Sequence, residues 1–211
     1  MDAGKFITFE GGEGAGKSTQ VALLAGYLRD RGNEVVLTRE PGGSPGAEQI
    51  RDLLVKGDIA RWEGITEALL NYAARIEHLS KTVRPALNDG QWVISDRFAD
   101  STMAYQGYGH GLGREKVETL HTWALGDFAP DLTLILDLDV EDGLKRATDN
   151  GGGEDRYERM DRDFHQRLRQ GFLDIAAREP QRCAVIDAAG SIEAVQEAIR
   201  EAVSSRLGLS R

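Results

Sequence analysis

The sequence predicts an α/β fold in which a parallel sheet is covered by helices on both faces. Five short runs of apolar and β-branched residues recur along the 211 residues, and longer stretches of helical periodicity lie between them. This alternation is typical of a parallel sheet, because each new strand needs a crossover helix to bring the chain back. A glycine-rich loop directly follows the first run. Since ligands of such sheets bind at the carboxyl ends of the strands, we expect a ligand site at that edge.

The five expected strands span residues 6–10, 34–38, 92–96, 132–137 and 183–187. The first expected helix covers 22–30, where apolar residues recur at three- and four-residue spacing and stop near Gly32. A second, long helix covers 65–87. Further helices are expected near 116–125, 159–178 and 192–207.

The spacing of the glycine-rich loop has a mechanical meaning. Residues 11–18 fit the pattern Gly-x-x-x-x-Gly-Lys-Ser/Thr between a strand-like run and a helical stretch. The glycines let backbone N–H groups wrap a chain of phosphates, Lys17 reaches the outer phosphates, and Ser18 offers a hydroxyl to Mg²⁺. The residues expected to bind this ligand are Gly11, Gly12, Glu13, Gly14, Ala15, Gly16, Lys17, Ser18 and Thr19. The motif therefore predicts a site for a nucleoside triphosphate with magnesium.

Length and composition narrow the class of protein. A chain of 211 residues is long enough for one well-buried core and short for two α/β domains, so we expect one domain over 1–211. The net charge of −9 repels a nucleic-acid backbone, so we expect no nucleic-acid partner. Cys183 is the only cysteine, which suits a reducing compartment. The sequence has no stretch long enough for a membrane span and no signal-peptide pattern, so we expect a soluble, cytoplasmic protein.

Two polar stretches interrupt the pattern of strands and helices. Residues 39–46 form a loop rich in glycine and proline, and such loops are as often plain connections as sites. Residues 148–156 include three consecutive glycines and end on an arginine. This second stretch is either a disordered connector or, in a protein that handles phosphates, a lid over them, at about 148–158.

Two expected strands end in an acid that could serve the metal. Asp96 and Arg97 follow an apolar run, where the carboxylate could hold the hydration shell of Mg²⁺ and the guanidinium a second phosphate. Asp137 ends another apolar strand and competes for the metal role. The pattern alone does not choose between the two acids.

A set of motifs occurs in one order along the chain. The motifs are Phe9-Glu10-Gly11-Gly12-Glu13-Gly14-Ala15-Gly16-Lys17-Ser18, Thr38-Arg39-Glu40-Pro41-Gly42-Gly43, Tyr72-Ala73-Ala74-Arg75, and Asp96-Arg97-Phe98 followed by Asp100-Ser101 and Ala104-Tyr105-Gln106-Gly107. Each motif except the first is weak alone, but all of them in sequence are highly specific. The chain closely resembles the bacterial thymidylate kinases over nearly its whole length.

The resemblance implies a five-stranded sheet, a homodimer, and transfer of the γ-phosphoryl group of ATP to dTMP, which gives dTDP and ADP. In such an enzyme the protein mainly positions the substrates and neutralises charge on the moving group. The loop would hold ATP, with Lys17 and Ser18 serving its β- and γ-phosphates and Mg²⁺. Asp96 would then take the metal-side role, and Asp137 would have no assigned chemistry.

The same resemblance assigns residues to dTMP. Arg51 and Arg97 would clamp its phosphate, a task that suits planar bidentate donors. Arg75 would hydrogen-bond the carbonyl edge of thymine. The other residues implied on this side are Thr102 and Gln106 beside Arg75, Glu13 and Glu40 by the deoxyribose, Tyr105 in the space of a 2′-hydroxyl, and Pro41, Tyr72 and Ser101 at the substrate.

Two departures from the family pattern bear on these roles. Asn71 stands where the family usually has a phenylalanine that stacks on thymine, so stacking must come from Tyr72 or be weaker. Gly14 stands where some relatives carry an arginine in the phosphate loop. Relatives without that arginine usually have several arginines in the lid, but the lid stretch here is rich in glycine instead. The nearby arginines are Arg146, Arg156 and Arg159. Of these we expect Arg156 to contact ATP, either at the transferring phosphoryl group or stacked on adenine, with Arg146 or Arg159 as the alternative.

Other functions stay open at the level of sequence. One is a kinase for a different nucleoside monophosphate or for a non-nucleotide hydroxyl. Another is a nucleotide-binding switch without a second substrate, in which the arginines at 51, 75 and 97 would be surface charges. A nucleic-acid-stimulated ATPase is disfavoured by the acidic charge.

Overall fold

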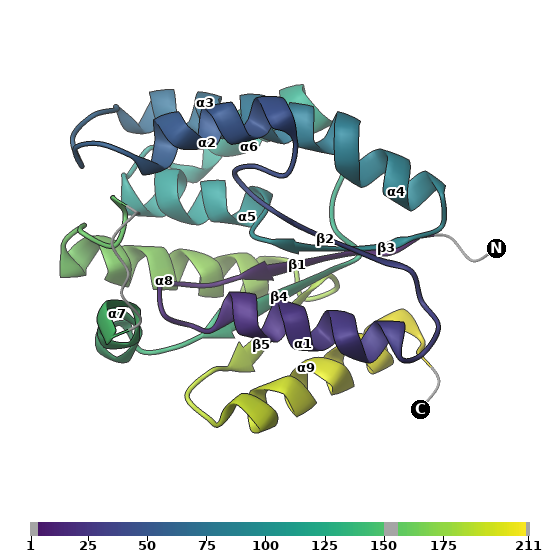
Figure 1. Ribbon diagram of the computed structural model, residues 1–211. Helices are drawn as coiled ribbons and strands as arrows, with labels where there is room; N and C mark the ends of the chain where they lie inside the picture. The colour runs from purple at the N-terminus through teal and green to yellow at the C-terminus, as the bar shows by residue number, and fades with distance from the viewer. Residues whose placement is uncertain (1–3, 150–155, 210–211) are drawn as a thin grey trace.

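The computed structural model describes residues 4–149 and 156–209, and Figure 1 labels its elements. Five strands form one parallel sheet in the order β2-β3-β1-β4-β5. They are β1 (Phe6–Glu10), β2 (Val35–Arg39), β3 (Trp92–Asp96), β4 (Leu132–Asp137) and β5 (Cys183–Asp187). The predicted fold class is confirmed, and each strand begins and ends within one residue of its predicted range.

β1 lies at the centre of the sheet, and all of its residues are buried. Phe9 is aligned with Asp96 of β3 on one side and with Leu134 of β4 on the other. Because parallel strands end at the same edge, the loop after β1 leaves the sheet between the ends of these two neighbours. The register therefore brings the phosphate loop beside Asp96.

Helices cover both faces of the sheet (Figure 1). α1 and α9 pack over a core on one face that includes Leu24 and Ile199, whereas the core on the other face includes Phe98 and Phe172. The helical elements are α1 (Lys17–Arg29), α2 (Pro45–Val55), α3 (Gly64–His78), α4 (Arg84–Asn88), α5 (Ala99–Thr102), α6 (Arg114–Leu125), α7 (Val140–Asp149), α8 (Arg162–Arg178) and α9 (Ile192–Leu207), with π-helical segments η1 (Leu79–Val83) and η2 (Met103–Gly109). Each face of the sheet therefore has its own apolar core.

Three helices of the structure are not predicted from the hydrophobic periodicity of the sequence. α2 starts at Pro45, inside the glycine- and proline-rich stretch, because proline is well tolerated in the first turn of a helix. α5 runs directly into η2, whose glycines and polar residues hide its helical period. α7 occupies the approach to the expected lid, and residues 150–155 of that stretch lie outside the described residues. The expected helix 65–87 is present as α3, η1 and α4 in succession.

None of the helices in the two described ranges is both long and apolar enough to cross a membrane. The single domain, the lid and the cytoplasmic location stay predictions.

Candidate active site

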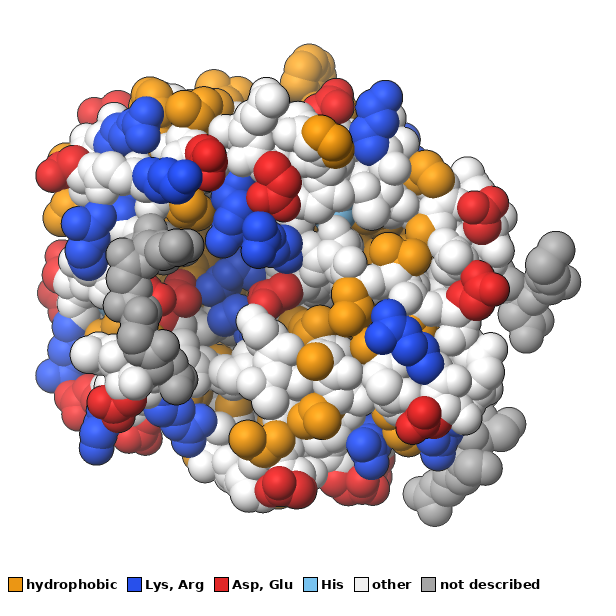
Figure 2. Space-filling view, viewed as in Figure 1, with side chains coloured by type: hydrophobic (Ala, Val, Ile, Leu, Met, Phe, Trp, Pro, Cys, Tyr) orange, Lys and Arg blue, Asp and Glu red, His pale blue; other side chains and the backbone are white. Residues whose placement is uncertain are grey.

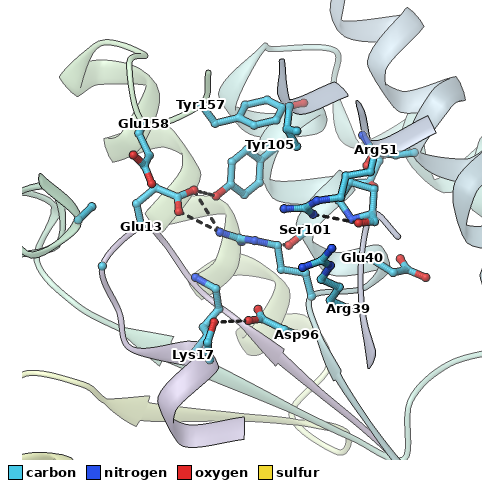
Figure 3. Close-up of a pocket in the computed structure, with 18 of the residues that line it drawn as sticks. Glu13, Lys17, Arg39, Glu40, Arg51, Asp96, Ser101, Tyr105, Tyr157 and Glu158 are labelled. Carbon is cyan, nitrogen blue, oxygen red and sulfur yellow. Dashed lines mark hydrogen bonds and ion pairs between the residues drawn. The ribbon is translucent and has the colours of Figure 1, made fainter. Parts of the chain in front are cut away.

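A cavity of about 460 Å³ lies at the carboxyl ends of β1 and β3 (Figure 3). The predicted site residues that line it are Glu13, Gly14, Gly16, Lys17, Ser18, Thr19, Glu40, Pro41, Arg51, Asp96, Arg97, Ser101, Thr102, Tyr105 and Gln106. The predicted site residues that do not line it are Gly11, Gly12, Ala15, Tyr72, Arg75 and Arg156. Most of the residues predicted for two different ligands thus meet in one cavity.

The phosphate loop joins β1 to α1 in a conformation that requires glycine. Gly14 has a φ of +67°, and a Cβ atom there would collide with the carbonyl oxygen of Gly143. The loop turns back so that the Lys17 ammonium donates to Gly11 O at 3.2 Å and to Gly12 O at 2.7 Å. Burial lowers the pKa of Lys17. Because α1 begins at Lys17 and its first residues line the cavity, the positive end of the helix dipole faces the same space.

Ser18 and Asp96 meet at the wall of the cavity. The Ser18 hydroxyl donates to Asp96 Oδ2 at 2.8 Å. Asp137 is engaged elsewhere, because Arg169 of α8 donates to its two carboxylate oxygens at 2.7 and 2.9 Å. The sequence pattern does not separate the two acids, but their positions do: Asp96 lies beside the phosphate loop, and Asp137 pairs with a helix.

Arg97 reaches from the end of β3 to the phosphate loop. Its φ of +70° lies in the left-handed region, and its backbone N–H donates to Phe9 O at 2.9 Å. From this turn Nη1 donates to Gly11 O at 3.0 Å, and Nη2 donates to Glu13 Oε1 at 3.1 Å. Ser101 Oγ accepts a further hydrogen bond from Nη1 at 3.3 Å. The guanidinium is therefore held in place by residues of two different elements.

Glu10, the last residue of β1, supports this turn from the core. Its carboxylate accepts hydrogen bonds from Phe98 N at 2.8 Å and from Ser101 Oγ at 2.5 Å. Burial, together with the neighbouring Asp100, raises the pKa of Glu10 to about 8. Glu10 thus anchors the start of α5, directly after Arg97.

Glu13 is oriented by groups from two elements. Arg97 donates to it from the end of β3, and Tyr105 of η2 donates its hydroxyl hydrogen bond to the same carboxylate. Burial alone would raise the pKa of Glu13, but the charges of Arg97 and Lys17 outweigh burial and hold the pKa below its ordinary value. Glu13 is therefore an anion at neutral pH, and it is positioned to accept hydrogen bonds in the cavity.

Cationic side chains gather in the cavity although the chain is acidic overall. Arg39, Arg51 and Arg97 line it together with Lys17. Figure 2 shows this group as blue side chains in the hollow near the middle of the face. Arg51 of α2 is held by Pro41, since Nη1 donates to Pro41 O at 2.9 Å. The cavity is therefore suited to ligands that carry several negative charges.

Arg75 lies behind the wall of the cavity. Nε donates to Glu40 Oε2 at 2.7 Å, and Nη2 donates to Phe98 O and Thr102 Oγ1, both at 3.0 Å. Nη1 is buried and has no hydrogen-bond partner among the described residues. Burial alone would lower the pKa of Arg75, but the charge of Glu40 outweighs burial and raises it. A fixed cation with one unused donor group thus stands beside two residues that line the cavity.

Tyr72 is placed differently from the expectation that it stacks on a base. It is 2% exposed, and its hydroxyl pairs with His121 Nδ1 at 3.1 Å. Its ring lies 4.6 Å from the Arg75 guanidinium. Asn71 lines the cavity instead, because successive helix residues point about 100° apart. Stacking by Tyr72 does not hold in this structure, since its ring packs in the core.

Arg156 is also placed differently from the expectation that it contacts ATP. It is 0% exposed, and Nη2 pairs with the buried carboxylate of Glu67. Nε donates to Leu54 O at 2.6 Å, and Nη1 donates to Ile59 O at 2.9 Å. The guanidinium therefore ties the chain to the end of α2 and to α3. Contact with ATP does not hold in this structure, because every nitrogen of the guanidinium is engaged inside the protein.

The cavity also contains residues that sequence reasoning did not assign to a ligand. They are Arg39, Val55, Asn71, Ala147, Tyr157 and Glu158. A signal exists for Arg39, which ends β2 at the edge of the sheet where ligands bind. The others lie on helices and turns. Tertiary packing decides which of their side chains point into the cavity, so no local sequence pattern predicts them.

A parallel sheet of this order, a phosphate loop after its central strand and a second cationic group in the same cavity define a P-loop phosphotransferase. The family model described as Thymidylate kinase matches residues 9–199. The chain belongs to the thymidylate kinase family.

Individual relatives are similar over almost the whole chain. The thymidylate kinase of Caulobacter vibrioides is 54% identical over 209 residues, which cover 99% of this chain and 100% of that protein. The thymidylate kinase of Rhizorhabdus wittichii is 50% identical, with 97% of this chain and 99% of that protein covered. The crystal structure of thymidylate kinase from Ehrlichia chaffeensis has a TM-score of 0.76 and 38% identity, and the match covers 96% of this chain and 99% of that one.

Proposed function

We propose that this chain carries out the reaction of its family, the ATP-dependent phosphorylation of dTMP to dTDP. The observation that carries the proposal is that one cavity holds two cationic groups of different origin. Lys17 belongs to the phosphate loop, whereas Arg51 and Arg97 come from α2 and from the end of β3. A nucleotide-binding switch needs only the first group. A phosphotransferase needs both, because it must hold two phosphate-bearing substrates against their mutual repulsion.

On the donor side, the proposal assigns ATP to residues 11–19. The backbone N–H groups and the N-terminus of α1 supply partial positive charge for its phosphates, and Lys17 supplies a full charge. Ser18 and Asp96 would hold Mg²⁺, since oxygen atoms are the ligands that this ion prefers and theirs lie 2.8 Å apart beside the loop. Among the described residues, no three histidine, cysteine or acidic side chains are grouped so that they could hold a metal ion, so the other ligands would be phosphate oxygens and water. Bound there, Mg²⁺ would neutralise charge on the phosphates.

On the acceptor side, Arg51 and Arg97 would bind the dTMP phosphate through two-point contacts. Arg75 would donate to the 4-carbonyl oxygen of thymine, an assignment that its unpartnered Nη1 supports. Thr102 and Gln106, which line the cavity, would complete the base site. The rest of dTMP would contact Glu13, Glu40, Pro41, Ser101 and Tyr105.

In the transfer step, an oxygen of the dTMP phosphate attacks the γ-phosphorus of ATP, and the bond from that phosphorus to the bridging oxygen of ADP breaks. The attacking oxygen is already ionised near pH 7, so no general base is needed. Lys17 and Arg97 both donate to Gly11 O, which brings the donor-side and acceptor-side cations together. At that point they can stabilise the charge on the moving phosphoryl group.

An ADP-release assay tests this function. We expect dTMP to stimulate ADP formation strongly, with dTDP as the second product on chromatography. Parallel assays with dUMP, dCMP, dAMP and dGMP test for a kinase with a different acceptor. Slow ATP hydrolysis that dTMP does not change would support a nucleotide-binding switch and would refute the proposal.

The partner proposed for the protein itself is a second copy of this chain. Ile65, Leu69 and Ile76 follow one face of α3, and Leu69 is 52% exposed. Trp123 of α6, on the same side of the fold, is 80% exposed (Figure 1). Figure 2 shows apolar side chains along the upper edge of the molecule over these helices. An exposed apolar stripe of this kind marks an interaction surface, which a homodimer would bury.

Light scattering after gel filtration tests the dimer. We expect twice the mass of the chain for the wild type and a monomer for Leu69→Lys. Leu23→Lys on α1 is a matched control, because Leu23 is also an exposed leucine but lies on the other face of the sheet. A monomeric wild type at micromolar concentration would contradict the proposal.

A further inference from the structure

His78 is a buried residue to which the proposed reaction gives no role. It lies on α3, three residues after Arg75, and is 0% exposed. Its Nδ1 pairs with Glu40 Oε1 at 2.8 Å, and its Nε2 pairs with Thr38 Oγ1 at 2.6 Å. A carboxylate oxygen can only accept, so Nδ1–H donates to Glu40. The Thr38 hydroxyl can donate or accept, so it can pair with Nε2 in either role.

Glu40 connects His78 to the proposed base site. Its second oxygen accepts from Arg75 Nε at 2.7 Å, so both carboxylate oxygens are engaged. Arg75 in turn donates to Thr102 Oγ1 at 3.0 Å. A line of hydrogen bonds therefore runs from Thr38 through His78, Glu40 and Arg75 to Thr102. Glu40 and Thr102 line the cavity, whereas His78 and Thr38 do not.

Packing keeps the imidazole of His78 in one position. Gly43 lies so close to it that a Cβ atom on Gly43 would be 2.6 Å from His78 Nε2. Thr82 Oγ1 donates to Gly43 O at 2.7 Å and holds that loop against the ring. Because the ring has no room to move away, it enforces one position of the Glu40 carboxylate.

We infer that His78 is a positioning residue for base selectivity: by holding Glu40, it fixes the orientation in which Arg75 presents its donors. The inference rests on the proposed function, in which Arg75 faces the 4-carbonyl group of thymine. A fixed donor disfavours cytosine, because the 4-amino group of cytosine is also a donor and leaves the buried guanidinium nitrogen unpaired. Without His78, one oxygen of Glu40 loses its partner and the carboxylate gains rotational freedom. Arg75 then gains freedom as well, and the discrimination between bases declines.

A matched pair of substitutions separates the hydrogen bond from the volume of the ring. His78→Asn keeps an amide donor at the place of Nδ1. His78→Leu has nearly the same shape as His78→Asn but has no donor. Both variants leave the same space beside Thr38. The measurements are kcat and KM for dTMP and dCMP at saturating ATP, KM for ATP, the Kd of dTMP by calorimetry without ATP, and the melting temperature.

For His78→Leu we expect kcat/KM for dTMP to fall about tenfold, mainly through KM and Kd, because a hydrogen bond to a charged group is lost. We expect a much smaller loss for dCMP, an unchanged KM for ATP, and most of the dTMP preference retained in His78→Asn. Equal losses in the two variants, or equal losses for dTMP and dCMP, indicate a merely structural role and overturn the inference.

Thr38→Val keeps the inference testable if His78→Leu does not fold. It removes the hydroxyl that pairs with Nε2 at 2.6 Å and orients the imidazole, so His78 is expected to hold Glu40 less firmly. We expect a partial fall in the preference for dTMP over dCMP, and an unchanged preference overturns the inference. The wild type separates the two proposals: absence of dTMP phosphorylation refutes the proposed function, whereas an active wild type with unaltered selectivity in the variants refutes only the role of His78.

Discussion

Tyr105 of η2 donates its hydroxyl hydrogen bond to Glu13 of the phosphate loop and thereby joins the two sides of the cavity. The ring of Tyr105 also lies 5.0 Å from the guanidinium of Arg97, which pairs with Glu13 at 3.1 Å. Residues from the loop after β1, the end of β3 and η2 thus hold one another. A change at any of the three is expected to disturb both nucleotide sites.

The ring of Tyr105 is expected to exclude a 2′-hydroxyl. Tyr105→Ala opens that volume, so kcat/KM for the ribonucleotide analogue relative to dTMP is expected to rise about tenfold or more, the equivalent of ~1–3 kcal/mol. Tyr105→Phe is the control, because it keeps the ring and removes the hydroxyl that donates to Glu13. It is expected to keep the deoxyribose preference. The same ratio in wild type and Tyr105→Ala would show that the ring does not face the sugar.

Lys17→Ala is expected to lower kcat about a hundredfold to a thousandfold, since it removes the charge that the proposed mechanism uses to stabilise the transferring phosphoryl group. The fold is expected to persist, because the Lys17 ammonium donates its hydrogen bonds to carbonyl oxygens of the phosphate loop. Lys116→Ala, at an exposed position of α6, serves as the control for loss of a lysine. ADP release and circular dichroism check both points. Near-normal turnover in Lys17→Ala would remove the assignment of the phosphate loop.

The acceptor preference is expected to run from dTMP to dUMP to dCMP. Loss of the methyl contact costs dUMP about 1–3 kcal/mol, and dCMP meets a donor at Arg75 where thymine offers an acceptor. Arg75→Lys keeps the charge and loses the planar fork, so it is expected to narrow the gap between dTMP and dCMP. Competition assays with mixed acceptors measure the order directly. A wild type that prefers dCMP would refute the role of Arg75.

Stability is expected to decline with pH because of Glu10. Its pKa is raised to about 8 in the folded protein, from an ordinary value of 4.5. Between these two pKa values the folded state binds more protons than the unfolded state. The contribution of Glu10 to the free energy of unfolding is therefore full below the unfolded-state pKa and is lost as pH rises through the folded-state pKa. Within that window the slope is about 1.4 kcal/mol per pH unit.

Glu10→Gln imitates the protonated carboxyl group and is expected to flatten this decline. Urea unfolding of both proteins between about pH 5 and 8.5 measures the two slopes. Parallel slopes would show that Glu10 keeps an ordinary pKa.

Arg156→Ala is expected to act mainly on stability. It leaves Glu67 buried without its arginine, which costs about 3–5 kcal/mol, and it lowers the melting temperature by roughly 6–20 °C. The double variant Arg156→Met with Glu67→Gln removes both charges and is expected to recover part of the loss. A role at ATP predicts the opposite result: kcat or KM for ATP would change while the melting temperature stays the same.

The strands and the phosphate loop are predictable because local signals determine them. The continuous apolar run of β4 indicates a strand buried on both faces, and the loop spacing places Lys17 and Ser18 whatever surrounds them. The motif Asp96-Arg97 is visible, but its preference over Asp137 becomes clear only when Arg169 of α8 is seen to occupy the second acid.

The remaining site depends on contacts between distant parts of the chain. Glu67 and Arg156 are 89 positions apart, and a glutamate among apolar helix residues reads as a surface position. Tyr72 and Asn71 exchange their expected places because the rotation of α3 is set by its packing against other helices. Which side of a helix points into the cavity depends on tertiary packing, so neither helix propensity nor a short motif predicts it.

Arg97 is the one non-glycine residue with a positive φ among the residues described here, and its guanidinium also donates to Gly11 and Glu13 of the phosphate loop. A side chain in that region costs about 1–3 kcal/mol, which glycine would avoid. Stability and activity therefore favour different residues at the end of β3. A screen for heat resistance alone would select glycine at this position and remove the proposed phosphate clamp with it, so thermal engineering of this enzyme has to keep Arg97 unchanged.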